Sequence, residues 1–155
     1  MMFEPAKKHL AAHDLEERIM VFTVSSETVE MAAAAVGCVP GMIAKTLSFL
    51  VDGGPALIVA AGDARIDNRK FKVRFRQKPV MLPAWQVEEL VGHEVGGVCP
   101  FGVKPGVSVY LDHSLRRFDT VYPACGSGNS AVRLSPGELE SVCDIAGWVD
   151  VCRFP

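Results

Sequence analysis

Two apolar runs in the first half of the chain predict the centre of the fold. They cover residues 42–51 and 56–61 and are joined by Asp52-Gly53-Gly54-Pro55. Apolar runs of this length around a Gly-rich turn are typical of a hairpin of buried strands. Other short apolar runs predict strands at about 19–22, 107–112, 119–124, 131–134 and 148–152. The chain therefore contains the strands of a sheet.

Capping residues predict helices between these strands. Helices are expected over residues 4–12 and 83–91, because Gly92 follows the second segment and can end it. The clearest helix start is Ser135-Pro136-Gly137-Glu138. Ser135 can act as the N-cap, proline fits the first helical position, and Glu138 completes a capping box.

A further helix is predicted between the first strand and the apolar hairpin. Ser25 or Ser26 can cap it, Glu27 and Glu30 fall in its first turn, and Gly37 follows its end. Helices interleaved with hairpins are typical of an α/β domain of the mixed α+β kind, with a mixed sheet. The absence of a GxGxxG motif after the first strand argues against a Rossmann fold.

Residues 67–78 fit two structures. Phe71, Val73 and Phe75 alternate with basic residues, which is the period of a strand. Asp67 could instead cap a helix. The pattern alone leaves both structures open.

Length and composition predict a single folded domain over residues 1–155. Apolar residues make up 49% of the chain and charged residues 22%, which is enough to form a core. The N-terminus lacks the apolar segment of a secretory signal, and the longest uncharged stretch, 31–44, is interrupted by glycine and proline. We therefore expect a cytoplasmic protein without a membrane span.

Cysteine and histidine spacing argues against a disulfide framework and against a metal centre. The five cysteines are an odd number and form no CxxC pair, which favours reduced thiols. The four histidines lack ligand-like spacing to the cysteines. We expect neither a metal nor another cofactor.

The net charge of −2 conceals a basic segment. Residues 65–78 carry +6, so the rest of the chain carries −8. A basic stripe on an otherwise acidic protein suggests contact with a polyanion, although a solvated surface is the commoner meaning of a charge run. The basic residues concerned are Arg65, Arg69, Lys70, Lys72, Arg74, Arg76 and Lys78.

Lys45 is the first candidate for chemistry. It lies within the apolar run of the first hairpin strand, and lysine is rarely buried without a partner. Its compact positive charge suits a phosphate or a terminal ribose. A lysine on the solvent face of an edge strand is an equally good interpretation from the sequence alone.

Two glycine-containing loops are further candidates. Glycines allow a backbone to approach a ligand closely, and consecutive N–H groups can hold a carbonyl oxygen or an oxyanion. An ordinary tight connection or a polar hairpin turn explains each loop as well. The first loop is Gly96-Gly97-Val98-Cys99-Pro100-Phe101-Gly102, and the second is Gly126-Ser127-Gly128-Asn129-Ser130.

Cys99 could also act as a nucleophile if His93 or His113 lay beside it. Cysteine is more often a small core residue, which favours the structural interpretation. Neither a Gly-x-Ser-x-Gly elbow nor an HExxH helix is present, so serine triads and zinc hydrolysis of those types are excluded.

Taken in order, several of these motifs resemble the YbaK/ProX aminoacyl-tRNA deacylase family, the free-standing relatives of the editing domain of some bacterial prolyl-tRNA synthetases. The resemblance covers about residues 20–150. The motifs that carry it are Ile43-Ala44-Lys45-Thr46-Leu47, Ala60-Ala61-Gly62-Asp63, the loop at 96–102, and the loop at 124–130 before a capped helix.

The resemblance implies a curved, barrel-like mixed sheet flanked by helices and hydrolysis of the ester in mischarged aminoacyl-tRNA. Lys45 would hold the 3′-terminal nucleotide, and water or a group of the substrate would attack. The backbone at Gly96, Gly97 and Gly102 would polarise the carbonyl. It also favours a helix from residue 67, with its basic face beside the tRNA acceptor stem. The substrate would contact Thr46, Val98, Cys99, Pro100, Phe101, Gly126, Ser127 and Asn129.

Two positions depart from known branches of the family. Ala131 stands where the cysteinyl-specific branch is expected to have aspartate, and Thr46 stands where the alanyl-specific branch has asparagine. Neither specificity is therefore predicted. The expected partners are the tRNA 3′ end and an aminoacyl-tRNA synthetase, with either a monomer or a dimer. The rival hypotheses are a non-catalytic aminoacyl-tRNA or small-ligand binder and a hydrolase that depends on Cys99.

Overall fold

The computed structural model describes residues 3–155 and places the apolar hairpin at the centre of the fold. Strands β2 (Ile43–Val51) and β3 (Gly54–Ala61) pair antiparallel, with Lys45 opposite Ala60. Asp52 and Gly53 both have positive φ, at 50° and 77°, as the tight hairpin turn between the strands requires. The predicted hairpin is confirmed.

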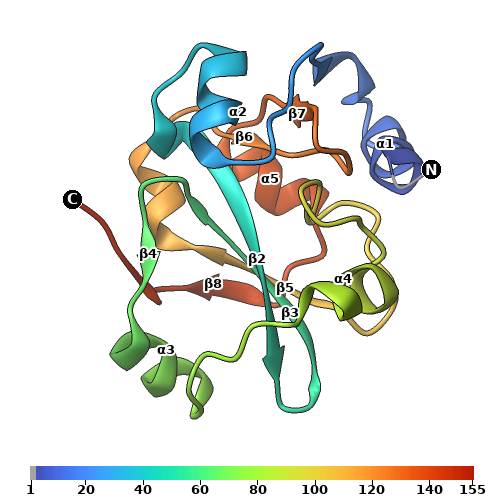
Figure 1. Cartoon of the computed structure of the whole chain (residues 1–155). Coiled ribbons are helices and arrows are strands. Elements are labelled where there is room, and N and C mark those ends of the chain that lie inside the picture. The colour runs from blue at the N-terminus through green and yellow to red at the C-terminus, as the bar shows by residue number, and fades with distance from the viewer. Residues whose placement is uncertain (1–2) are drawn as a thin grey trace.

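Three more strands complete a curled, half-barrel sheet of order β6-β2-β3-β5-β8 (Figure 1). All three pair parallel to their neighbours, so the sheet is mixed, as predicted. These strands are β5 (Ser108–Asp112), β6 (Tyr122–Pro123) and β8 (Gly147–Val149). Two small antiparallel pairs lie outside this sheet: β1 (Ile19–Val21) with β7 (Ser130–Val132), and β4 (Arg65–Ile66) with β9 (Cys152–Arg153).

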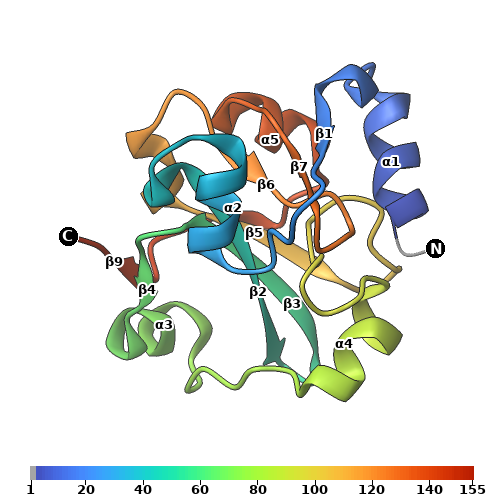
Figure 2. The same ribbon diagram turned by 45° about the horizontal axis from the view of Figure 1, so that its top comes forward.

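Five α-helices surround the sheet within the described residues (Figures 1 and 2). None of these helices is both long and apolar enough to cross a membrane. The helices are α1 (Phe3–Ala12), α2 (Val29–Val36), α3 (Asn68–Phe75), α4 (Ala84–Val91) and α5 (Pro136–Val142). Short 3-10 turns occupy Glu16–Arg18, Pro40–Met42 and His113–Arg117.

The segment that fitted both a helix and a strand forms helix α3. The Asp67 carboxylate accepts hydrogen bonds from the backbone N–H groups of Arg69 and Lys70, each at 3.0 Å, and so caps the helix. Phe71 and Phe75 are four residues apart and both buried, so they share one helix face. The intervening Val73 is 78% exposed, which contradicts the strand interpretation.

Helix α2 begins later than predicted. Its N-cap is Thr28, whose side chain accepts a hydrogen bond from the Met31 N–H at 3.1 Å, not Ser25 or Ser26. The Ser26 N–H donates instead to the Gly128 carbonyl at 2.7 Å, which holds this segment extended against a distant loop. Glu27 therefore lies before the helix and not in its first turn.

The main core lies on the central sheet and includes every residue of β3 from Leu57 to Ala61. Phe49 from β2 packs against Phe71 of α3, with 5.0 Å between ring centroids. The Gly102 N–H donates to His9 Nδ1 at 2.9 Å and so joins the glycine loop to α1. These contacts fix the strands and loops that surround the site.

Candidate active site

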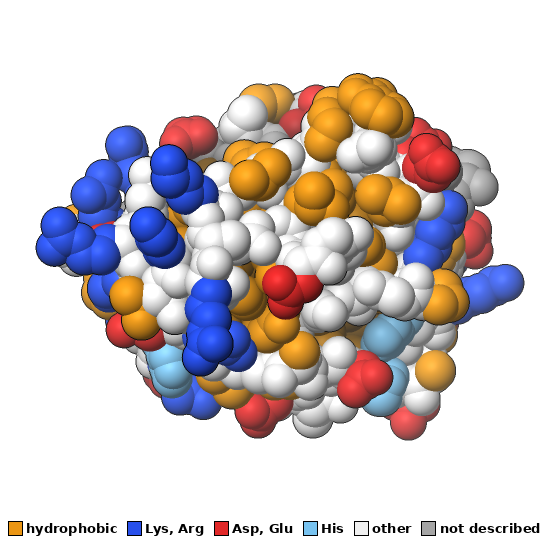
Figure 3. Space-filling model, turned by 90° about the horizontal axis from the view of Figure 1, so that it is seen from below, with side chains coloured by type: hydrophobic (Ala, Val, Ile, Leu, Met, Phe, Trp, Pro, Cys, Tyr) orange, Lys and Arg blue, Asp and Glu red, His pale blue; other side chains and the backbone are white. Residues whose placement is uncertain are grey.

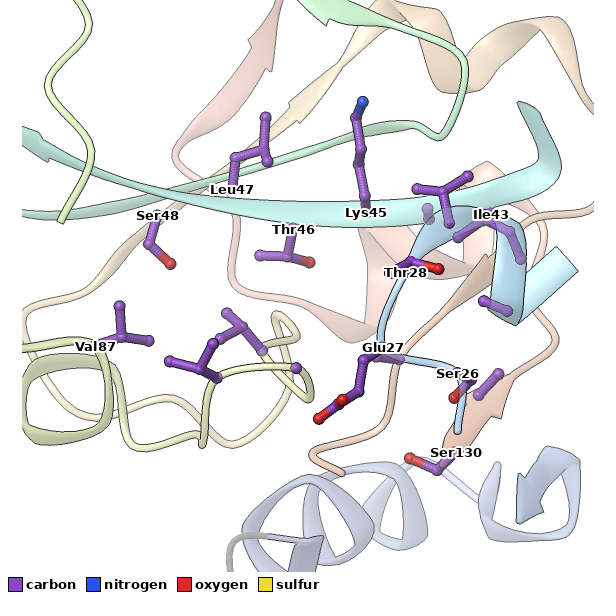
Figure 4. A pocket seen from close by; sticks show the side chains of 18 of the residues that line it. Ser26, Glu27, Thr28, Ile43, Lys45, Thr46, Leu47, Ser48, Val87 and Ser130 are labelled. Carbon is purple, nitrogen blue, oxygen red and sulfur yellow. The ribbon is translucent and has the colours of Figure 1, made fainter. Parts of the chain in front are cut away.

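A cavity of about 300 Å³ opens beside β2 and brings together segments that are far apart in sequence (Figure 4). Its walls are the approach to α2 at 26–32, strand β2 at 43–48, the segment 81–87, the glycine loop at 95–98 and the region 122–131. A cavity of this volume suits a small molecule or the end of a larger ligand. Lys45, Thr46, Gly96 and Val98 are the predicted site residues that line it.

Lys45 borders this cavity, but its side chain leaves β2 on the side opposite to Thr46 (Figure 4). The ammonium donates hydrogen bonds to the carbonyl oxygens of Ala64 and of Gly62, the latter at 3.4 Å. Burial lowers the pKa of Lys45 from its usual 10.5, and nearby negative groups partly oppose this shift. An ammonium has three donors, so one is left for a ligand.

Asp63 carries a carboxylate close to Lys45, but this carboxylate forms an ion pair with Arg117. Its oxygens accept hydrogen bonds from the two terminal nitrogens of Arg117 at 2.5 and 3.1 Å. This interaction with Arg117 lowers the pKa of Asp63. A bidentate pair of this kind is geometrically specific, and among the described residues Asp63 forms its ion pair with Arg117 and not with Lys45.

Two buried hydroxyl groups in the cavity walls have no hydrogen-bond partner among the described residues. They are Ser26 Oγ and Thr46 Oγ1. A buried hydroxyl without a partner costs free energy, so such groups are expected to bond to water or to a ligand. The predicted contact of Thr46 with a substrate agrees with this placement, whereas Ser26 was expected only as a helix cap.

The glycine loop reaches the cavity through Gly96 and Val98. Within the described residues their backbone N–H groups make no hydrogen bond, whereas the Gly97 N–H donates to the Glu94 carbonyl at 3.0 Å. Gly97 packs instead against the second loop: a β-carbon there would lie 2.5 Å from the Ser127 nitrogen. Gly97 therefore supports the cavity wall, and Gly96 and Val98 can supply donors to a ligand.

The other end of the predicted loop lies away from the cavity. Gly102 has a φ of +61°, packs against the backbone of Pro5, and uses its N–H for His9. It cannot polarise a carbonyl in the cavity. Cys99, Pro100 and Phe101 are buried and are likewise absent from its walls.

Cys99 lies in the core beside His93. Its sulfur is 3.5 Å from His93 Nε2 and 3.7 Å from the carbonyl oxygen of Phe101, and the residue is fully buried. Burial raises the pKa of the Cys99 thiol well above its usual value of 9.0. A nucleophile must reach its substrate as a thiolate, so this geometry argues against the Cys99-dependent mechanism.

We expect Cys99→Ala to leave kcat/KM for ester hydrolysis within about threefold of wild type, because the thiol does not reach the cavity. The lost packing should lower the free energy of unfolding by about 1 kcal/mol. Deacylation rates and denaturant unfolding would measure the two effects. Complete loss of turnover in a Cys99→Ala variant that remains folded would support the hypothesis that Cys99 is the nucleophile.

The second glycine-containing loop forms a wall of the site but is largely bonded to itself. The Ser127 hydroxyl donates to Asn129 Oδ1 at 2.9 Å and lies 2.8 Å from the Ser130 hydroxyl, while Asn129 Nδ2 donates to the Phe22 carbonyl. Gly126, Ser127 and Asn129 are absent from the cavity lining, which Ser130 and Ala131 reach instead.

Glu27 is a charged residue of the cavity lining that the sequence did not reveal as a site residue. Its side chain lies at the opening of the cavity and against the glycine loop (Figure 4). A β-carbon on Gly96 would lie 2.5 Å from Glu27 Oε1, and one on Gly128 would lie 2.8 Å from its Cγ. Two positions without side chains therefore make room for this carboxylate.

The predicted basic residues gather around α3, where Lys and Arg side chains cover one end of the molecule (Figures 1 and 3). Lys70 is partly engaged, because its ammonium binds the Asp150 carboxylate and the Cys152 carbonyl, each at 3.0 Å. Arg65 is close enough to Lys45 for its charge to contribute to the lowered pKa of that lysine. Those that remain exposed are Arg65, Arg69, Lys72, Arg74, Arg76 and Lys78.

The sequence pattern of the aminoacyl-tRNA editing domain family matches residues 23–142. The chain therefore belongs to this family. A Bacillus subtilis protein described as the uncharacterized protein YwhH is 47% identical over 99% of this chain and 98% of its own length.

Proline–tRNA ligases are also similar to part of this chain. Those of Lysinibacillus sphaericus and Halalkalibacterium halodurans are 31% and 32% identical over 66% and 75% of it. The matching region is only 18% and 20% of these ligases, so this chain resembles one portion of each.

Two solved structures share the fold along nearly their whole length. The hypothetical protein APE2540 has a TM-score of 0.85 and 29% identity, with 96% of this chain and 99% of that chain covered. A candidate trans-editing enzyme for prolyl-tRNA synthetase has a TM-score of 0.87 and 26% identity, with 98% and 97% covered. The curved mixed sheet that the resemblance predicted is thus confirmed.

Proposed function

We propose that this protein is a trans-editing hydrolase that cleaves the ester of mischarged aminoacyl-tRNA, with residues 1–155 acting as one domain in the cytoplasm. The observation that supports this most is one cavity bordered by both Lys45 and the backbone of Gly96 and Val98. Lys and Arg side chains also gather on one end of the molecule (Figure 3). The chain belongs to the aminoacyl-tRNA editing domain family, which supports an aminoacyl ester as the ligand of this cavity.

In this proposal the 3′ end of tRNA enters from the basic surface around α3. Arg65 is exposed on this surface, and its charge acts on Lys45 at the border of the cavity. A phosphate or ribose oxygen of the terminal nucleotide would accept the free donor of Lys45. The acceptor stem would lie along α3, where phosphate neutralisation by arginine and lysine supplies affinity without reading sequence.

The aminoacyl ester would lie between Thr46 and the glycine loop. The free N–H groups of Gly96 and Val98 would polarise its carbonyl, in place of the predicted donors Gly97 and Gly102. Water, or a hydroxyl of the substrate, would attack the carbonyl carbon, and the bond to the tRNA oxygen would break. Overall one water is consumed, and the products are a free amino acid and tRNA with its 3′ hydroxyl restored.

A panel of mischarged tRNAs, each carrying a radiolabelled amino acid, tests the activity. We expect the purified protein to accelerate release of at least one amino acid well above spontaneous hydrolysis, because positioning and carbonyl polarisation suffice for an activated ester. Correctly charged tRNAs serve as the matched controls.

Two outcomes would contradict the proposed activity. Spontaneous rates on every mischarged tRNA would exclude a deacylase. Binding of aminoacyl-tRNA that falls steeply with salt, without turnover, would instead support the non-catalytic binder.

A further inference from the structure

We propose that the Glu27 carboxylate binds the α-ammonium group of the aminoacyl moiety and so selects substrates with a free amino group. This inference rests on the proposed function, because it assigns the substrate contacts of the same cavity. Glu27 lies just before α2, because that helix begins later than the sequence predicted.

The backbone that carries the carboxylate is held in place, and the exposed carboxylate has no counter-ion among the described residues. The Ser26 N–H binds the Gly128 carbonyl at 2.7 Å, and the Glu27 N–H donates to Ser25 Oγ at 3.3 Å, so the backbone on both sides is fixed. Within residues 3–155 the side chain of Glu27 makes no salt bridge and no hydrogen bond. A carboxylate that lines a cavity and has no cationic partner of its own can bind a cationic group of a ligand.

The glycine loop brings this carboxylate beside the proposed carbonyl donors. Oε1 of Glu27 lies within contact of Gly96, whose φ of +96° and missing side chain both allow the close approach. In an aminoacyl ester the α-ammonium is one carbon away from the carbonyl. A carbonyl bound at the Gly96 N–H would therefore place the ammonium near Glu27.

The charges of the cavity match those of an aminoacylated 3′ end. Lys45 places a cation at one border of the cavity, and Glu27 places a carboxylate in its lining by the glycine loop. The ligand carries a phosphate at one end and an ammonium at the other, so only one orientation pairs both charges. Asp63, one of the carboxylates whose charge acts on Lys45, is occupied by Arg117.

The test compares free and acetylated amines. The substrate is the mischarged tRNA of the panel that wild type deacylates fastest, with and without an acetyl group on its α-nitrogen. Wild type is expected to prefer the free amine about tenfold or more in kcat/KM, because hydrogen bonds to charged groups are the stronger ones. Glu27→Gln should remove most of this preference by slowing the free-amine substrate alone.

A matched control variant and a binding measurement test the role of Glu27 independently of whether the protein hydrolyses the ester. Glu94→Gln removes the same charge from an exposed residue of the same loop that does not line the cavity, and should retain the preference. Affinity for 3′-alanylamino-3′-deoxyadenosine, which has an amide in place of the ester, should likewise fall about tenfold in Glu27→Gln and stay unchanged for its N-acetyl form.

Equal turnover of both substrates by wild type would overturn the role of Glu27 while leaving the deacylase intact. An equal loss on both substrates in Glu27→Gln would overturn it as well, because that result indicates a structural role. If no mischarged tRNA is cleaved, the proposed activity fails, and the amide analogue still decides whether Glu27 recognises the amine.

Discussion

Replacing Lys45 with methionine is expected to lower kcat/KM for deacylation by about 100- to 1,000-fold, the usual effect of removing one charged group that positions or stabilises a reacting substrate. Methionine keeps the apolar stem of the side chain and removes only the ammonium. The loss should appear in both kcat and KM, because the lysine would hold the nucleotide next to the reacting ester. Single-turnover and steady-state deacylation assays would measure it.

The same variant should remain folded at neutral pH. Folding lowers the pKa of Lys45 below 10.5, so its protonated form destabilises the native state, and that penalty disappears as the pH rises from the lowered pKa towards 10.5. Removing the charge therefore offsets the lost hydrogen bonds to Gly62 and Ala64. We expect the free energy of unfolding at pH 7 to change by no more than about 1 kcal/mol.

Deacylation within a few-fold of wild type in Lys45→Met would contradict this role of the lysine. A strongly destabilised variant would show that the ammonium is needed for folding and would also contradict the expectation. Denaturant unfolding and the assay, carried out on the same preparation, distinguish these outcomes.

Gly97→Ala is expected to have the largest effect on the cavity wall. A β-carbon there would lie 2.5 Å from the Ser127 nitrogen and 2.7 Å from the Gly126 carbonyl carbon, so backbone must move. Such overpacking typically costs about 2–3 kcal/mol. Because the two loops would separate, we expect at least about a tenfold loss of kcat/KM, since small misplacements of a substrate strongly reduce rate.

Gly137→Ala is the matched control. Its nearest neighbour would be Ser135 Oγ at 3.9 Å, and the residue lies in helix α5, where alanine is the better helix former. We expect stability to rise by about 0.5 kcal/mol with unchanged activity. If Gly97→Ala behaved like this control, the proposed contact between the two loops would be wrong.

Local chemistry made much of the fold predictable. The capping box at Ser135 and Glu138 forms as expected, with both hydrogen bonds at 3.0 Å, because all its partners lie within four residues. Asp67 also caps a helix, but its sequence pattern competed with a strand. The family resemblance favoured the helix, and the packing of Phe71 and Phe75 into the core confirms it.

The parts of the fold that the sequence did not predict depend on contacts between residues far apart in the chain. The strand at 65–66 was not predicted, and the single strand predicted at 148–152 is divided into β8 and β9. Strands β4 and β9 pair only with each other, across more than half of the chain. Ser26 was expected to cap a helix, yet its backbone binds Gly128, about 100 residues away. No local pattern contains that contact.

The candidate site was predictable to a similar extent. The sequence and the family resemblance identified Lys45, Thr46, Gly96 and Val98, which line the cavity. They could not show which loop N–H groups are already used within the protein, as those of Gly97 and Gly102 are. Glu27 was not predicted as a site residue, because an acidic residue after a serine also fits the first turn of a helix.

The attachment of the 22–28 segment to the loop at 128–130 has a consequence for biosynthesis. Phe22 and Ser26 donate to the carbonyls of Asn129 and Gly128 at 2.7 Å each, and β1 pairs with β7 beside them. A ribosome would have to translate more than four-fifths of the chain before this wall could close. During that interval the nascent chain would lack a complete cavity wall, so the cavity could form only after residues 128–132 had been made.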